Sequence, residues 1–153
     1  MIILKRTKAD EAALQEIAID PDDLKDDGTD YLEKRIKKPW GHEIEKFNNG
    51  SVSVWWLHIH SWQQTSMHCH PSKDTVLFVV AGEAVLSTLS YNHEVGAGDL
   101  VVIAKGVFHR MTAKASACVL YELETPINKR DLVRLEDSYG RGQGYEKCES
   151  TTP

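Results

Sequence analysis

The amino-acid sequence predicts an all-β fold, an antiparallel sandwich or closed barrel, and its clearest sign is an alternating stretch at residues 52–60. Two sets of side chains alternate along this stretch, one containing Trp56 and His58 and the other Trp55 and Leu57. That two-residue period is typical of a β-strand. Many short strands separated by regular turns are typical of sandwiches and barrels. Further β-rich runs follow at 75–80, 84–90, 100–104 and 117–123.

The overall composition excludes several classes of function. The chain has 153 residues, enough for one domain with its own core. Its net charge of −5 argues against a nucleic-acid partner bound through the phosphate backbone. No stretch approaches the roughly 20 apolar residues of a membrane span, so we expect no membrane partner. The three cysteines, Cys69, Cys118 and Cys148, are too scattered for a disulfide framework, so we expect a reducing, cytoplasmic location.

We expect one domain with an extension at each end. In the N-terminal extension, residues 1–38, Thr7-Lys8-Ala9-Asp10 resembles a capping box, and apolar residues then recur at helical spacing up to Asp20-Pro21. The barrel is expected at residues 39–125. Residues 126–153 are polar and lack core periodicity, which predicts a C-terminal arm that lies over the barrel or a partner, or is partly disordered.

Histidines gather in one short part of the chain. His58, His60, His68 and His70 fall within 13 residues, and the last two form an H-x-H pair. Side chains two residues apart on a strand face the same side, so two imidazoles can converge on one ion. Neutral imidazole binds divalent transition metals well. Spacing alone leaves a metal site and ordinary surface histidines as equal alternatives.

The residues around the H-x-H pair resemble the two-part signature of the cupin family, and they span about residues 68–113. In addition, Lys38-Pro39-Trp40-Gly41 is similar to the opening of the cupin domain in type II mannose-6-phosphate isomerases. The resemblance implies a jelly-roll barrel and one divalent ion, Zn, Fe, Mn or Ni, bound by His68, His70 and His109. The positions that match the signature are His68, His70, Gly82, Gly98, Asp99, Gly106 and His109.

Three positions depart from the family pattern. Thr75 stands where the family has a glutamate ligand, Ala104 replaces a proline, and Ala113 replaces an asparagine. Asp74 is adjacent to Thr75 and is the expected fourth protein ligand if the strand shifts or bulges. A three-histidine site completed by water is the alternative. These departures affect the expected catalysis more than the expected metal binding.

Three functions remain open from the sequence. The first is a sugar or sugar-phosphate isomerase or epimerase, which needs a general base beside the metal. The candidate bases are His58, Tyr121 and Glu122, and His58 lies on the cavity floor only if its set of side chains faces inward. The second is a three-histidine iron dioxygenase, and the third is a sugar or metabolite binder without catalysis. In each case we expect a small-molecule partner and, from the apolar residues on both faces of the 52–60 strand, a homodimer.

Overall fold

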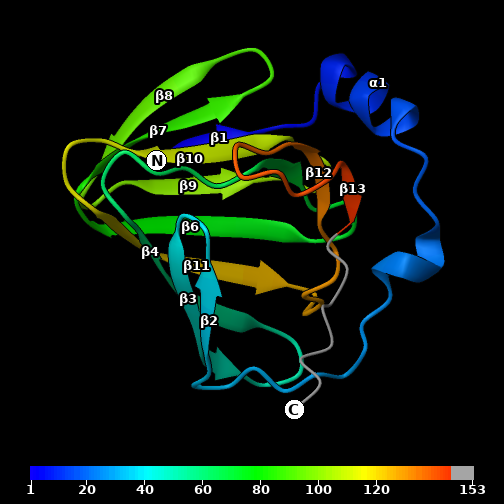
Figure 1. The fold of residues 1–153 in the computed structure, drawn as a ribbon, viewed down its shortest axis with the longest axis horizontal. Helices are drawn as coiled ribbons and strands as arrows, with labels where there is room; N and C mark the ends of the chain where they lie inside the picture. Colours follow the sequence, from blue (N-terminus) through cyan, green and yellow to red (C-terminus); the bar gives the residue numbers. More distant parts are fainter. Residues whose placement is uncertain (146–153) are drawn as a thin grey trace.

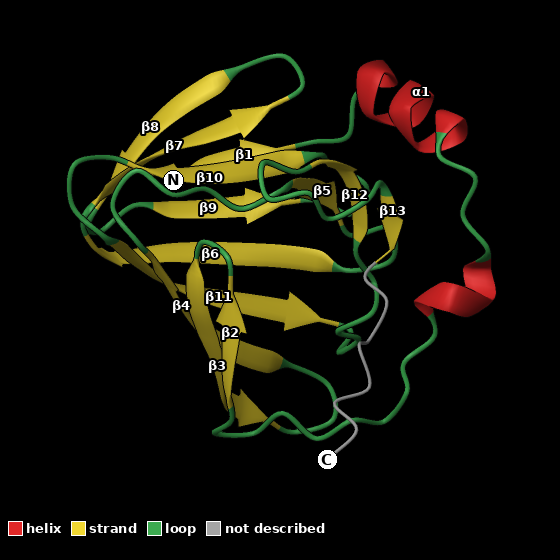
Figure 2. Cartoon of the chain, viewed as in Figure 1, coloured by secondary structure: helices red, strands yellow, loops and turns green. Residues whose placement is uncertain are grey.

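The structure is a computed structural model that describes residues 1–145, and two facing β-sheets form most of it (Figures 1 and 2). Within these residues the larger sheet has seven strands in the order β1-β9-β6-β11-β4-β3-β2. Neighbouring strands in it are antiparallel apart from β1 and β9, which run parallel. Its strands are β1 (Ile2–Leu4), β2 (Arg35–Lys38), β3 (Gly41–Asn48), β4 (Ser53–Ile59), β6 (Asp74–Ala81), β9 (Leu100–Ile103) and β11 (Cys118–Thr125).

The smaller sheet has six described strands in the order β13-β12-β5-β10-β7-β8, all paired antiparallel. Chain segments far apart in the sequence meet in it, since β5 lies between β10 and the C-terminal β12. The all-β, jelly-roll prediction is therefore confirmed. Its strands are β5 (Met67–Cys69), β7 (Glu83–Thr88), β8 (Asn92–Gly96), β10 (His109–Ala113), β12 (Val133–Glu136) and β13 (Gly144–Tyr145).

Two short helical elements, α1 (Lys8–Glu16) and the 3-10 helix η1 (Pro21–Leu24), lie outside the sheets (Figure 2). The predicted capping box begins α1: Thr7 N donates to Asp10 Oδ2 at 2.8 Å, and Asp10 N donates to Thr7 Oγ1 at 3.3 Å. The buried Asp10 also accepts the backbone N–H of Phe108 at 2.9 Å. The helix is thus attached to the segment that leads into β10.

The two ends of the chain are both joined to the barrel. In the N-terminal extension, β1 and β2 form the two edges of the larger sheet. In the C-terminal arm, β12 pairs with β5, and the last eight residues of the arm, 146–153, with Cys148, lie outside the described residues. No helix in residues 1–145 is long and apolar enough to cross a membrane.

Alternation in β4 places one set of side chains in the core. Trp55, Leu57 and Ile59 are buried between the sheets, whereas Trp56 and His58 are only partly buried on the outer face. The inner set packs against buried residues of β6, β7, β10 and β11 in one continuous hydrophobic cluster. Burial of that face holds the register of the sheet, because a slip of one residue would exchange the two faces.

The outer face of the larger sheet is unusually apolar. Tyr121 on β11 lies opposite Phe78 on β6 and opposite Trp56 on β4, which in turn lies opposite Ile44 on β3. The rings of Trp56 and Tyr121 meet edge to face, with centroids 5.0 Å apart. This row of four side chains, called the outer row below, crosses four strands, and Phe78 is 38% exposed. Contiguous apolar patches on a protein surface mark interaction sites.

Candidate metal centre

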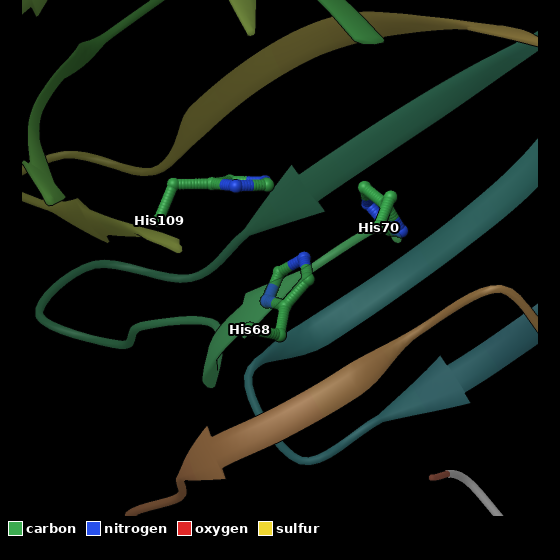
Figure 3. Close-up of side chains that lie close together, drawn as sticks. All are labelled: His68, His70 and His109. Atoms are coloured by element: carbon green, nitrogen blue, oxygen red, sulfur yellow. The ribbon is translucent and has the colours of Figure 1, made fainter. Parts of the chain in front are cut away.

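Three buried histidines from two neighbouring strands of the smaller sheet face one another (Figure 3). His68 lies on β5, His70 follows it directly, and His109 begins β10 at the position paired with His68. Their ring centroids are 4.5 to 5.6 Å apart. One nitrogen from each ring lies within 4.8 Å of those of the other two. The structure therefore brings together the three histidines that the sequence motif singled out.

Each of the three imidazoles is oriented by a backbone carbonyl. Nδ1 of His68 donates to Ser66 O at 2.9 Å, Nδ1 of His109 to Val107 O at 2.9 Å, and Nδ1 of His70 to Asp131 O at 2.6 Å. A carbonyl can only accept, so Nδ1 must hold the hydrogen, and in a neutral ring Nε2 keeps its lone pair. An outer partner of this kind is the usual companion of a metal-binding histidine.

The protonation state of the rings suits metal binding. Burial lowers the pKa of all three histidines below its ordinary value, because desolvation disfavours the charged form. The rings are therefore neutral at neutral pH, as a ligand must be. Nε2 of His70 is buried and has no hydrogen-bond partner. A buried nitrogen left in that state is costly unless an ion or water occupies the space beside it.

A carboxylate from β11 completes the surroundings of the histidines. Oε1 of Glu122 lies 3.9 Å from Nε2 of His70. Burial, and then the nearby charge of Glu124, raises the pKa of Glu122 to about 7. Glu124 itself is bound by the buried Lys73, whose Nζ lies 2.6 Å from Oε1. Glu122 is thus the predicted base candidate that the structure places beside the histidines.

The structure does not bring Asp74 to the site. Asp74 begins β6 with its side chain exposed, and its Oδ1 accepts the backbone N–H of Lys105 at 2.9 Å. Thr75 is the neighbour that faces inward, and its buried Oγ1 has no hydrogen-bond partner. No shift of β6 exchanges these two faces, because the β6 pairing is regular from Asp74 to Val79. We therefore abandon Asp74 as the fourth ligand.

His58 and Tyr121 also lie away from the histidine site, on the outer face of the larger sheet. The ring of His58 lies between those of His42 and His60, with centroid distances of 5.0 and 5.1 Å. Tyr121 belongs to the outer row and packs on Trp56. Neither lines the cavity beside the histidines. The inward orientation considered for His58 is wrong because Trp55, Leu57 and Ile59 occupy the inner face of β4.

Sequence reasoning missed a set of charged residues, some buried and some half-buried, that line the same cavity. Lys129 from the C-terminal arm lies 2.8 Å from Glu43 Oε1 and 3.7 Å from the ring centroid of Trp55. Lys38 also contacts Glu43, at 3.4 Å. Burial alone would raise the pKa of Glu43, but Lys129 and Lys38 together lower it to about 2. Glu43 stands between a histidine and an isoleucine and gives little sequence signal of burial, and Lys129 stands in a polar segment without periodicity.

The cavity itself is small, about 60 Å³, and the three histidines, Glu122 and the buried charges surround it. It also borders apolar core residues such as Leu57 and Leu120. A space of this size holds an ion with a few waters, whereas whole ligand sites are usually about 300–1,000 Å³.

The comparison of families agrees with the motif and the fold. Residues 53–123 match the sequence model of the Cupin domain family. The two-sheet barrel and the positions of the histidines agree with that match. Residues 53–123, which form most of the barrel, are therefore similar to the Cupin domain family, and the chain has the fold of that family. No curated protein matches the chain.

Solved structures with the same fold share little sequence with this chain. A conserved protein with a double-stranded β-helix domain from Klebsiella pneumoniae has a TM-score of 0.60 at 18% identity, over 70% of this chain and 92% of that one. The capsular polysaccharide assembling protein CapF from Staphylococcus aureus has a TM-score of 0.59 at 17% identity, over 67% of this chain and 34% of that one. A sugar phosphate isomerase from Silicibacter pomeroyi has a TM-score of 0.52 at 15% identity, over 56% of this chain and 59% of that one. At these identities the likeness shows the fold alone.

Removal of one imidazole should abolish tight metal binding. Removing an outer partner of a metal-binding histidine weakens metal affinity by roughly 10- to 100-fold. His109→Ala removes a ligand itself, so we expect its affinity for a divalent ion to fall by more than that. Elemental analysis after dialysis against a trace-metal buffer measures the bound ion. His93→Ala, a histidine on β8, is the matched control and should retain the metal. Unchanged metal content in His109→Ala would place the site elsewhere.

Neutralising Glu43 should destabilise the fold in a pH-dependent manner. Glu43→Gln leaves the half-buried Lys129 without its carboxylate, so the free energy of unfolding should fall by about 1–3 kcal/mol at pH 7. The folded pKa of Glu43, about 2, is below the ordinary 4.5. Its carboxylate therefore adds stability that is complete above pH 4.5 and is lost as pH falls through about 2.

Urea unfolding at a series of pH values checks this expectation. The difference between wild type and Glu43→Gln should narrow as pH falls below 4.5. The matched control is Glu33→Gln, because the Glu33–Lys46 ion pair at 3.0 Å is exposed and should contribute no more than about 1 kcal/mol. A difference that stays constant at every acidic pH would contradict the assignment.

Proposed function

We propose that this chain is a metal-dependent cupin enzyme of the isomerase or epimerase type that acts on a sugar or a sugar phosphate. The observation that carries the proposal is the arrangement of three Nδ1-anchored histidines around one space with the Glu122 carboxylate beside it. A divalent ion held by His68, His70 and His109 would polarise a substrate carbonyl or hydroxyl. Zn, Fe, Mn and Ni all accept imidazole ligands of this kind.

Glu122 is the residue we assign as the general base. Isomerisation and epimerisation of sugars require a proton to be taken from carbon and returned. Glu122 Oε1 faces the histidines, and its raised pKa of about 7 allows it both to accept and to release a proton near neutral pH. Lys73 binds Glu124 rather than Glu122, so the Glu122 carboxylate is left for the substrate.

The sugar substrate is supported by the solved structures with this fold. They include a sugar phosphate isomerase and a capsular polysaccharide assembling protein. The small cavity would accommodate only the reacting end of such a molecule. A cytoplasmic setting remains our expectation, and Cys69 and Cys118 are buried and free.

The enzymatic proposal is tested by proton exchange. Metal-loaded protein is incubated in D₂O with a panel of aldoses, ketoses and their phosphates, and NMR follows loss of the carbon-bound proton. We expect Glu122→Gln to lower kcat by roughly 10²- to 10⁴-fold, the usual contribution of a general base. His58→Gln is the control and should leave kcat unchanged, since His58 lies on the outer face.

Two results would replace the proposal with one of its alternatives. Oxygen consumption by the iron-loaded protein, without proton exchange, would support the dioxygenase. Saturable binding of a sugar without exchange or turnover would support a binding protein.

We further propose a homodimer that buries the outer row. Phe78 of that row is 38% exposed, and an apolar cross-strand row of this kind is stabilised when a second copy covers it. Light scattering at micromolar concentration should give twice the chain mass of 17.2 kDa.

The matched variants place a charge inside and outside the outer row. Phe78→Glu should give the monomer mass. Tyr91→Glu should leave the dimer intact, because Tyr91 lies outside the outer row, at the turn between β7 and β8. It is a suitable control because it is also aromatic and is 69% exposed. A monomer in the wild type, or a dimer in Phe78→Glu, would contradict the assignment.

A further inference from the structure

His70 is held differently from the other two histidines. The carbonyls that accept from His68 and His109 belong to residues two positions earlier on the same segment. The carbonyl that accepts from His70 belongs to Asp131, which lies 61 residues later, in the C-terminal arm. The orientation of one ligand therefore depends on whether the arm is docked.

The side chain of Asp131 binds the loop that follows His70. Its carboxylate is fully buried and accepts the backbone N–H of Ser72 at 2.9 Å and that of Lys73 at 3.0 Å. The same residue thus holds His70 through its carbonyl and the next turn through its carboxylate. Hydrogen bonds to a buried carboxylate are among the stronger ones in proteins.

The rest of the arm continues this contact along the ligand strand. Arg134 on β12 lies opposite His68 on β5, and Val133 lies opposite Cys69. Lys73 Nζ donates to Asn128 O at 3.1 Å, which joins the loop to the beginning of the arm. Docking of the arm and placement of both histidines of the H-x-H pair therefore involve one continuous set of contacts.

We propose that Asp131 is a positioning residue for the metal centre and that arm docking and metal binding stabilise each other. The inference rests on the proposed metal site at the three histidines. With the arm docked, the ring of His70 has one orientation and presents Nε2. With the arm released, the ring of His70 can rotate. Metal binding must then also order this ring, which weakens the affinity for the ion. By thermodynamic linkage, an ion that binds the docked form more tightly also favours docking by the same factor.

The first test measures the affinity for Zn²⁺ of folded protein, by competition with a chromophoric chelator well below the unfolding temperature. Asp131→Ala keeps the backbone carbonyl but removes the carboxylate that holds the arm to the loop after His70. If arm docking places that carbonyl, we expect the affinity to weaken toward the roughly 10- to 100-fold loss caused by removing an outer partner. Asp131→Asn keeps an acceptor oxygen and should restore part of the loss. A purely structural role would lower the Tm of the variants and leave this affinity unchanged.

A matched control exists in the same arm. Asp137 also uses its carboxylate to hold a local turn, accepting from Tyr139 N at 3.0 Å and from Arg141 N at 2.9 Å, and within residues 1–145 its hydrogen bonds go to this turn and not to His70 or its loop. Asp137→Ala should therefore retain wild-type affinity for Zn²⁺. An equal loss in Asp137→Ala and Asp131→Ala would overturn the specific role of Asp131.

The second test measures whether Zn²⁺ protects the C-terminal arm from proteolysis. Trypsin cleavage after Lys129 and Arg130, followed by mass spectrometry, should be slower in the wild type with Zn²⁺ than without it. In Asp131→Ala the protection by Zn²⁺ should be much smaller. If Asp131→Ala does not fold, Asp131→Asn and the wild-type protection decide the question.

The failures are distinguishable. A wild type that binds no Zn²⁺ refutes the metal site and the inference with it. A wild type that binds Zn²⁺, with Asp131 variants of equal affinity and no protection of the arm, refutes the inference alone.

Discussion

The burial of three neutral imidazoles in one place is the constraint on which the rest of the site depends. Each ring must give its Nδ1–H to an acceptor, because an unsatisfied donor in a buried site costs about 1–3 kcal/mol. Backbone carbonyls of Ser66, Val107 and Asp131 supply those acceptors. Carbonyls are fixed by the fold, so the direction of every Nε2 is fixed with them. The barrel, the turn before β10 and the docked arm together determine the ligand geometry.

The parts of the site that follow local spacing were predictable from the sequence. His68 and His70 share a face because they are two residues apart, and Gly106 adopts a positive φ of 78° in the turn before His109. Its N–H donates to His70 O at 2.7 Å, which joins the two halves of the motif. The choice of face was less certain. His58 and Asp74 both lie one residue away from the inward position, and a one-residue choice has no local signal when both faces of a strand are apolar.

The contacts that cross long distances in the chain could not be predicted from the sequence. Lys129 and Asp131 stand in a polar segment whose pattern indicates neither strand nor core, yet Lys129 binds Glu43 at the cavity and Asp131 binds the loop after His70. Their positions depend on the pairing of β12 with β5, which only the folded chain specifies. Buried charges of this kind are tolerated only with partners, and Glu43 supplies one for Lys129. A site predicted from residues 39–125 alone therefore lacks the contributions of the C-terminal arm.

The position of the carboxylate illustrates the same limit within the barrel. The family motif has a glutamate where this chain has Thr75, so the sequence offered only the adjacent Asp74 as a carboxylate ligand. Thr75 lies opposite Glu124 in the pairing of β6 with β11, and Glu122 is the next residue of β11 on that inner face. Side chains of adjacent strands that share a face lie about 5 Å apart when directly opposite and 7–8 Å apart on the diagonal, within reach of a long side chain. The carboxylate missing at Thr75 is thus matched by one on the neighbouring strand, where we assign it as the base, so the groups around a barrel site must be compared across the strands as well as along them.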